Sequence, residues 1–300
     1  MPETQLVVMS EAAVEEWRAH HAAAGGSSFP DPSASDGVEV EALEVVVGDV
    51  AVGGVVLSHR ADLARTTIRL LDTTLDDDDA PRWLAVLAAI ESYAVTRGAR
   101  SLVTAVSPRL LAPLQQAGFT VTMTGVGVTV AHGPDRRMVD DGRVRLRAMD
   151  DDERRRFVPD AREILRSGMS QAGVLAEPGA PMDTVEQRLA GLVESPPSDE
   201  VLLLASVDGV PVGRFWGTLA ERDGVVDLVG NTIDLFPEHR GKGLTRPFMA
   251  ALETYAREHR LRDFRGRLYG HERRARTTVV GMGAGIDDVH LRKDLDRPPA

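Results

Sequence analysis

Hydrophobic and polar residues along the second half of the chain follow, in turn, the two-residue period of strands and the three-to-four-residue period of helices. The expected strands are 144–148, 201–207, 212–219, 225–235, 264–269 and 289–291, and the expected helices are 153–165, 184–193, 245–257 and 274–282. Asp208-Gly209 and Asp223-Gly224 are typical hairpin turns between three of these strands. An antiparallel meander, a crossover helix, a parallel strand, a helix and a last strand predict an α+β fold with helices layered on a sheet.

The first half repeats this order. Its expected strands are 42–47, 51–57, 66–71, 101–106 and one after Gly118-Phe119, and its expected helices are 81–93 and 108–116. An ungapped offset of 165 residues, which separates Arg240 from Leu75, lays apolar positions of the second half on apolar positions of the first. The pattern predicts a duplication: two tandem domains, each with a mixed central sheet flanked by helices.

Proline, glycine and charged residues cluster between the two halves. We therefore expect a first domain at 1–133, a linker at 134–142 and a second domain at 143–300. A chain of 300 residues suits two domains of about 150 residues each.

Composition narrows the function classes. Hydrophobic residues make up 43% of the chain and charged residues 27%, as in an ordinary globular protein. No apolar run approaches the roughly 18–20 residues that cross a bilayer, and the N-terminal residues do not resemble a signal peptide. We expect a cytoplasmic protein without a membrane partner.

The chain has no cysteine, which excludes disulfides, thiolate metal sites and cysteine nucleophiles. Its formal net charge of −11 argues against a nucleic-acid partner, because such binding needs a basic surface, and favours a cationic substrate such as an amine. No metal is expected.

The strand that ends at Leu235 runs into Arg240-Gly241-Lys242-Gly243-Leu244-Thr245 and then into a helix. Glycines let backbone N–H groups turn toward an anion, and a helix N-terminus adds its unpaired amides and positive dipole end. Positive charge around the same point comes from Arg240, Lys242 and Arg246. This combination predicts a pyrophosphate site; a glycine-rich solvent turn is the alternative.

The pattern Pro-x-x-Arg-Gly-x-Gly between a strand and a long helix resembles the acyl-CoA signature of the GNAT (N-acetyltransferase) superfamily, Arg/Gln-x-x-Gly-x-Gly/Ala. Arg240 and Gly243 match it, and Thr245 departs from it at the last position. The resemblance implies a GNAT fold, acetyl-CoA or another acyl-CoA as cosubstrate, and a pyrophosphate held by the amides of Gly241, Gly243, Leu244 and Thr245. It also implies that the main chain of Leu235 takes the pantetheine arm.

In the first half, the same offset places Asp76-Asp77-Asp78-Asp79-Ala80 where the second half has its glycine loop. Four carboxylates would repel a pyrophosphate, because like charges a few Å apart cost on the order of 1 kcal/mol even in water. The first domain is therefore expected not to bind CoA. One degenerate and one competent domain in tandem resemble the plan of mycothiol synthase and related transferases.

Acyl transfer to an amine needs a base for the ammonium and an acid for the leaving thiolate. At the positions where GNAT enzymes usually have Glu and Tyr, this chain has Val229 and Val279. Strand alternation puts Asp227 and Asn231 on the face of Val229, where either can orient a water that acts as base; a polar face of a half-exposed strand is equally consistent. Tyr269 is the nearest substitute for the acid.

Three functions are compatible with these features. The first is an N-acyltransferase that acts on the amine of a small molecule by direct attack on the thioester. The second is a catalytically silent acyl-CoA-binding or sensing module, which the loss of the usual Glu and Tyr favours. The third is a protein-lysine acetyltransferase. The acceptor and the oligomeric state do not follow from the sequence.

Overall fold

The computed structural model describes residues 3–23, 38–76, 79–130, 139–174, 182–194, 196–222 and 224–295. The chain forms two compact units, the first of two separate segments and the second of one continuous segment. Unit 1 is Met1–Thr122 with Asp288–Ala300, and unit 2 is Met123–Asp287. Within the described residues, no helix is long and apolar enough to cross a membrane.

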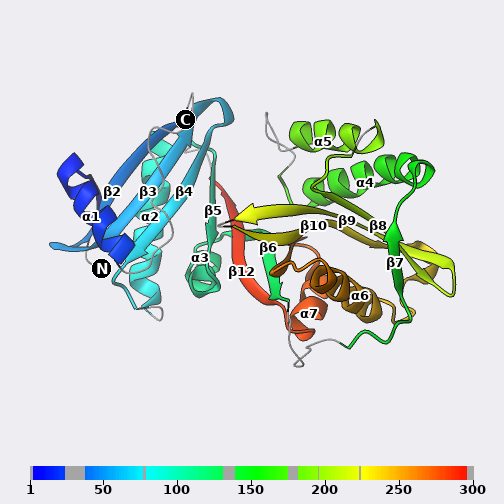
Figure 1. The fold of residues 1–300 in the computed structure, drawn as a ribbon. Helices are drawn as coiled ribbons and strands as arrows, with labels where there is room; N and C mark the ends of the chain where they lie inside the picture. The colour runs from blue at the N-terminus through cyan, green and yellow to red at the C-terminus, as the bar shows by residue number, and fades with distance from the viewer. Residues whose placement is uncertain are drawn as a thin grey trace. The chain divides into compact units, whose positions relative to one another are not determined.

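Unit 1 is a mixed sheet covered by helices (Figure 1). Its strands follow the order β1-β2-β3-β4-β5-β12; β4 and β5 pair in parallel, and β1–β2, β2–β3, β3–β4 and β5–β12 pair antiparallel. Its elements are β1 (Thr4–Val8), α1 (Glu11–Ala23), β2 (Glu39–Val47), β3 (Val50–Arg60), η1 (Ala61–Leu63), β4 (Arg65–Thr73), α2 (Ala80–Thr96), β5 (Ser101–Val106), η2 (Pro108–Leu110), α3 (Leu111–Gln116), the start of β6 (Thr120–Thr129) and the end of β12 (Gly285–Asp294).

Unit 2 repeats this plan, with strand order β6-β11-β10-β9-β8-β7 and a parallel β10–β11 pair. Figure 1 shows α4 and α5 on one face of its sheet and α6 and α7 on the other. Its elements are the rest of β6, β7 (Arg145–Ala148), α4 (Asp151–Gln171), α5 (Met182–Glu194), β8 (Glu200–Val207), β9 (Val210–Arg222), β10 (Val225–Leu235), η3 (Pro237–His239), α6 (Thr245–Glu258), β11 (Asp263–Tyr269), α7 (Arg273–Gly281) and the start of β12.

The sheet of unit 2 has a separate apolar core on each face. Phe215 points to the α6 side, where it packs with Phe248 and Phe264, and its neighbour Trp216 points to the α4–α5 side, where it packs with Phe157. Successive residues of a strand face opposite sides, so β9 anchors both helical layers at once. These layers fix the positions of α4 and α6, which border the site described below.

The duplication appears in matched details. The offset of 165 residues lays Ala80 on Thr245, where α2 and α6 begin, and it lays Thr120–Thr129 on Gly285–Asp294, the bounds of β6 and β12. Gly118 and Gly283 end the equivalent helices with φ of +90° and +101°. The two-domain α+β fold and the element order expected from the sequence are present.

Each unit contains a strand that comes from the other half of the sequence. The expected division into two continuous domains with a linker at 134–142 does not include this exchange. β6, from the first half of the sequence, pairs with β11 in unit 2, and the end of β12 pairs with β5 in unit 1. Lys293 on β12 secures this arrangement in unit 1: its ammonium donates to Glu91 Oε1 at 2.5 Å and to the carbonyl oxygen of Ala117 at 2.6 Å. Most of the expected linker, 134–138, lies outside the described residues.

Candidate functional site

Two left-handed glycines shape the loop between β10 and α6. Gly241 and Gly243 have φ of +75° and +72°. A Cβ built on either of them meets nothing within 4 Å, so the space beside the loop is open. Other residues are strained at such φ values, which is the local reason for glycine at both positions.

The first amides of α6 lack a side-chain cap. The N-cap is Leu244, whose buried apolar side chain makes no capping hydrogen bond. The amides of the first turn are therefore available to an external acceptor, and the dipole of this 14-residue helix favours an anion there. Thr245, the first helical residue, is exposed. These features fit a pyrophosphate.

The three predicted cations of the loop have different surroundings. Lys242 and Arg246 are exposed and have no ion pair with another described residue. Arg240 instead turns back, and its guanidinium donates to Asp234 Oδ1 at 2.9 Å and to the carbonyl oxygen of Leu235 at 2.8 Å. Arg240 thus fastens the loop to the end of β10, while Lys242 and Arg246 present uncompensated charge.

β10 and β11 separate beside this loop. Their parallel pairing ends at Gly230 and Gly266, yet β10 continues to Leu235 and β11 to Tyr269. Beyond the last pair, one edge of each strand has lost its neighbour, and a gap opens between them.

Backbone groups of Leu235 face this gap. The next residue, Phe236, donates its amide to the carbonyl oxygen of Val212 on β9, at 3.0 Å. Peptide groups alternate sides along an antiparallel strand, so the N–H and C=O of Leu235 point away from β9. The carbonyl oxygen of Leu235 already accepts from Arg240 Nε at 2.8 Å, so its N–H is the group that an extended ligand can meet in β-sheet fashion.

A β-bulge lies at the mouth of the gap. Gly230 and Thr232 pair with consecutive residues of β9, so Asn231 is extra, and its side-chain amide donates to Thr218 Oγ1 at 2.9 Å. Thr218 is the direct partner of Val229 across β9 and β10, so Asn231 lies on the face of Val229 that alternation assigns to it, and the bulge shifts only the faces of the residues that follow. Gly230, a glycine inside the strand directly before the extra residue, is the sequence signal for this bulge.

An apolar cavity of about 420 Å³ fills the gap. It extends from the start of α6 to the end of β11, and its lining includes Asn231, Ile233, Thr245, Met249, Tyr269 and Val279. The cavity therefore joins the glycine loop to two of the three predicted catalytic residues, Asn231 and Tyr269.

Tyr269, the last residue of β11, is one of the polar residues that line this cavity. Its ring packs directly against Gly168 of α4, where a Cβ would overlap the ring, and it stacks on His271 with ring centroids 5.8 Å apart. Burial, with a smaller effect from the Glu272 carboxylate, raises the pKa of Tyr269 to about 12. The hydroxyl is therefore protonated at neutral pH and can donate.

A second, polar pocket of about 790 Å³ meets the apolar cavity at Ile164, Tyr269 and Glu272, which line both. Carboxylates predominate in it: Asp160, Glu163, Asp234, Glu238 and Glu272 line the pocket together with two guanidiniums, those of Arg214 and Arg240. This excess of negative charge favours a cationic ligand.

Arg214 is the buried cation of the polar pocket. Its guanidinium donates to Asp160 Oδ2 at 2.8 Å and to Asp234 Oδ2 at 3.1 Å, and it lies over the rings of Phe157 and Phe236. Arg214 is balanced by these two carboxylates, and Glu163 pairs with Arg166 at 2.8 Å, so Glu238 and Glu272 are the carboxylates of this pocket that no described guanidinium balances.

Asp227, the third predicted catalytic residue, lines neither cavity. Its buried carboxylate accepts from Arg262 Nη2 at 3.1 Å and lies 3.5 Å from Arg265 Nε. Both guanidiniums also contact Asp263. This network joins β10 to β11 below the gap, and a carboxylate so placed stabilises the strand pair rather than meeting a substrate.

Unit 1 has no such loop in its described residues. At the equivalent position Leu75 is buried, and Asp79 caps α2 by accepting from the Arg82 amide at 3.3 Å. The α2 N-terminus therefore already carries its own carboxylate. Asp77 and Asp78 lie outside the described residues.

No protein-family model and no curated protein matches this sequence. Solved structures with similarity to the chain include three described as GNAT proteins. A tandem GNAT protein from the clavulanic acid biosynthesis pathway (without AcCoA) has 14% identity and a TM-score of 0.46, and the match covers 99% of this chain and 100% of that one. A GCN5-related N-acetyltransferase from Sphaerobacter thermophilus has 14% identity, a TM-score of 0.45 and coverage of 99% and 97%.

The third, an acetyltransferase from the GNAT family of Colwellia psychrerythraea, has 12% identity, a TM-score of 0.46 and coverage of 98% and 100%. At such values a likeness does not identify a substrate or an activity, which depend on the residues of the site.

The polar pocket is the part of the site that sequence reasoning missed. Its floor depends on α4, which supplies Asp160, Ile164 and Gly168 and is distant in sequence from β11. One signal was present: Arg214 and Asp234 have opposite charges on two strands joined by a predicted hairpin, and they are direct partners across β9 and β10.

Proposed function

We propose that unit 2 is an acyl-CoA-dependent N-acyltransferase, with acetyl-CoA as the favoured donor and a small-molecule amine as acceptor. The observation that carries the proposal is the junction of an apolar cavity, which begins at an open glycine loop, with a carboxylate-rich pocket at Tyr269 and Glu272. The apolar cavity and the glycine loop suit a thioester with a pyrophosphate, and the carboxylate-rich pocket suits an ammonium.

In this proposal, the donor lies along the edge of β10. The pyrophosphate accepts from the amides of Gly241, Gly243, Leu244 and Thr245, with Lys242 and Arg246 supplying charge. The pantetheine arm pairs with Leu235 in the gap. The thioester then lies near the bulge at Asn231, and the apolar lining excludes water from it.

The acceptor enters through the polar pocket, whose carboxylates attract its ammonium. After the ammonium loses a proton, its nitrogen attacks the thioester carbonyl, the C–S bond breaks, and the hydroxyl of Tyr269 donates to the departing thiolate. Glu272 is the carboxylate that lines both cavities, and one of its oxygens accepts from the Tyr269 amide at 2.7 Å. We assign the uptake of the amine's proton to Glu272, directly or through water, instead of to Asp227.

The test is thiol release from acetyl-CoA with a panel of small amines and a lysine-containing peptide. Turnover is expected with small amines, and Glu272→Gln is expected to lower kcat while CoA binding is retained. Saturable CoA binding with no turnover on any amine would instead indicate an acyl-CoA-binding module, the reading that Val229 and Val279 favour. Turnover of the peptide alone would indicate a protein acetyltransferase.

A further inference from the structure

Three polar side chains on neighbouring strands of unit 2 form a hydrogen-bonded network that ends at the apolar cavity. They are Glu200 on β8, Thr218 on β9 and Asn231 on β10. Thr218 is the direct partner of Glu200 across β8 and β9, and its hydroxyl lies 3.5 Å from Glu200 Oε2. The same hydroxyl accepts from Asn231 Nδ2 at 2.9 Å. Of the three residues, Asn231 is the one that lines the cavity.

The carboxylate of Glu200 is the fixed end of this network. Its side chain is only 3% exposed, and it pairs with Arg188 of α5. The indole N–H of Trp216 donates to Glu200 Oε2 at 2.6 Å, and the Arg188 guanidinium lies over the Trp216 ring. Because Trp216 belongs to the apolar core on this face of the sheet, the carboxylate is held from both the helix and the sheet.

The surroundings of the Thr218 hydroxyl decide the direction of each hydrogen bond. A guanidinium can only donate and a carboxylate can only accept, so the hydroxyl accepts from Arg188 Nη2 and turns its proton to Glu200. The Asn231 carboxamide must then direct its nitrogen to Thr218. Its oxygen, Oδ1, bonds to no other described residue and is not sealed from solvent. This oxygen is therefore open to a ligand as an acceptor.

Unit 1 repeats the bulge without this network. In both units one extra residue follows the last parallel strand pair, Asn231 in β10 and Arg69 in β4. The register then makes Val40 on β2 the counterpart of Glu200 on β8. A bulge in this fold does not by itself require a buried carboxylate, and the network occurs in the unit that carries the glycine loop.

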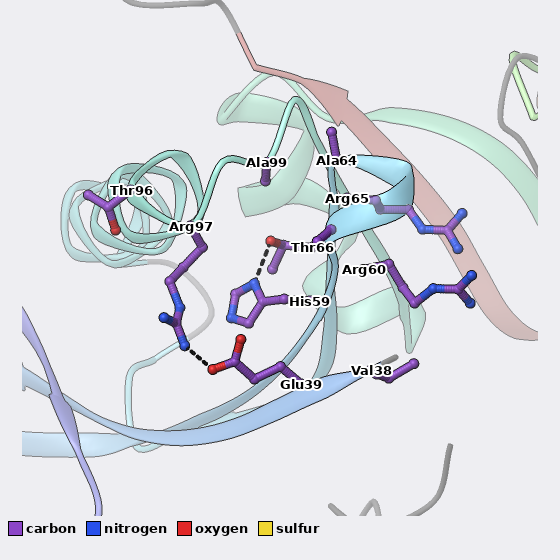
Figure 2. Close-up of a pocket in the computed structure, with 11 residues that line it drawn as sticks. Val38, Glu39, His59, Arg60, Ala64, Arg65, Thr66, Thr96, Arg97 and Ala99 are labelled. Atoms are coloured by element: carbon purple, nitrogen blue, oxygen red, sulfur yellow. Dashed lines mark hydrogen bonds and ion pairs between the residues drawn. The ribbon is translucent and has the colours of Figure 1, made fainter. Parts of the chain in front are cut away.

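Unit 1 does bury polar side chains, but at a different place. Figure 2 shows His59 and Thr66, whose Nδ1 and Oγ1 lie 2.8 Å apart, near the start of β4 and before its bulge. The network of unit 2 is thus not a feature common to both repeats. This difference supports a role in what unit 2 alone does.

We propose that Glu200 and Thr218 are positioning residues for acyl transfer, which hold the Asn231 carboxamide so that its Oδ1 accepts an N–H of the attacking amine. This inference rests on the function proposed for unit 2. A primary amine that has lost its proton to Glu272 keeps two N–H groups. Donation of one of them to Asn231 turns the nitrogen lone pair toward the thioester carbonyl. No covalent bond to Asn231 forms or breaks, and Tyr269 still protonates the thiolate.

The test is a double-mutant cycle in the full chain, with thiol release measured for ethylamine, ethanolamine and putrescine. Thr218→Val keeps the shape of the side chain but cannot accept from Asn231. Thr218→Val and Asn231→Ala are each expected to lower kcat about tenfold, as the loss of one hydrogen bond to the transition state does. In the Asn231→Ala background, Thr218→Val is expected to change kcat by less than about twofold, because it acts through Asn231. Thr218→Ser keeps the hydroxyl and is expected to restore kcat.

A matched control removes a strand hydroxyl in unit 1. Thr104 is buried and donates to the carbonyl oxygen of Ile68 at 3.1 Å, and Thr104→Val is expected to leave kcat unchanged. CoA affinity and thermal unfolding report the folding of every variant, and Thr218→Ala replaces Thr218→Val in the cycle if the valine variant does not fold. Additive effects of the Thr218 and Asn231 substitutions would overturn the proposal, and so would a Thr218→Ser variant as slow as Thr218→Val.

Titration of the CoA-saturated chain with the same amines separates this inference from the function on which it rests. If no amine is turned over but amine affinity follows the same cycle, acyl transfer is wrong and the positioning of Asn231 for an amine stands. If turnover occurs with additive effects, the positioning is wrong and acyl transfer stands. Absence of both turnover and amine binding would overturn both.

Discussion

Replacing Gly243 with alanine separates the part of the glycine loop that serves folding from the part that serves binding. At φ of +72° an alanine is strained by about 1–2 kcal/mol, and nothing lies within 4 Å of its added methyl. The folding cost is therefore this strain alone, equivalent to a fall in Tm of roughly 2–8 °C for a unit of this size. Gly224 is a matched control: φ is +73°, the surrounding space is equally open, and it lies in the β9–β10 hairpin.

Binding is expected to distinguish the two variants. An alanine at 243 relaxes by turning its peptide group away from the open side of the loop, which removes a hydrogen bond to the pyrophosphate. Such a charge-assisted bond is worth about 1.5–3 kcal/mol, so the Kd for CoA rises by roughly 10–150-fold. Gly224→Ala suffers the same strain and keeps its CoA affinity.

Calorimetric titration with CoA and thermal unfolding, run on both variants and the parent chain, supply the two readouts. Equal CoA affinities for Gly243→Ala and the parent would refute the assignment of the loop. Equal losses of affinity in both variants would show that CoA binding reports only the stability of unit 2.

Three further outcomes are expected. Tyr269→Phe is expected to lower kcat with little change in CoA affinity. Gly168→Ala is expected to do the same, because its new methyl displaces the Tyr269 ring. If steady-state assays show an unchanged kcat for both variants, Tyr269 has no part in the mechanism. Asp227→Asn lowers the free energy of unfolding by about 1–3 kcal/mol, since Arg262 and Arg265 lose one of their two buried carboxylate partners and keep Asp263, and denaturant titration measures this. The Arg147 guanidinium lowers the pKa of Glu153 to about 2, below its unfolded value of 4.5, so the stability that Glu153 contributes is present above pH 4.5 and is lost as the pH falls toward 2. Thermal scans are expected to show Glu153→Gln destabilised at pH 7 and progressively less so through that window.

Local features of the sequence predict the position of the glycine loop and the start of α6 well. A glycine loop between a strand and a helix depends on residues that are neighbours in the chain, and α6 begins at Thr245 as the pattern indicates. The expected N–H donors and two of the three expected cations lie together at its N-terminus. The position of Tyr269 also follows from local sequence, because it is the last residue of β11 and β11 lines the cavity.

Features that depend on distant contacts do not follow from local patterns. Gly230 signals a bulge, but which residue is extra results from the fit between β10 and β9, and the polar pocket results from packing of α4 against the end of β11. β1 and α1 were also missed, because the edge strand Thr4–Val8 is short and largely exposed and lacks the apolar alternation of a half-buried strand.

The sequence does not predict the strand exchange either, for a different reason. β6 and β12 descend from the same repeat and occupy equivalent positions, so their hydrophobic patterns do not tell which of β5 and β11 each one joins. The sequence predicts both strands, but it does not predict that β6 pairs with β11 and β12 with β5.

The strand exchange gives the first half of the chain a structural role in unit 2 that does not depend on a glycine loop of its own. The strand that covers the outer edge of β11, and with it the strand that carries Tyr269, is encoded before residue 130. A second half by itself would leave this edge of β11 bare, and prone to pair with other chains, unless β12 took the place of β6. The acyl transfer proposed for unit 2 therefore depends on a strand that the first half of the chain supplies.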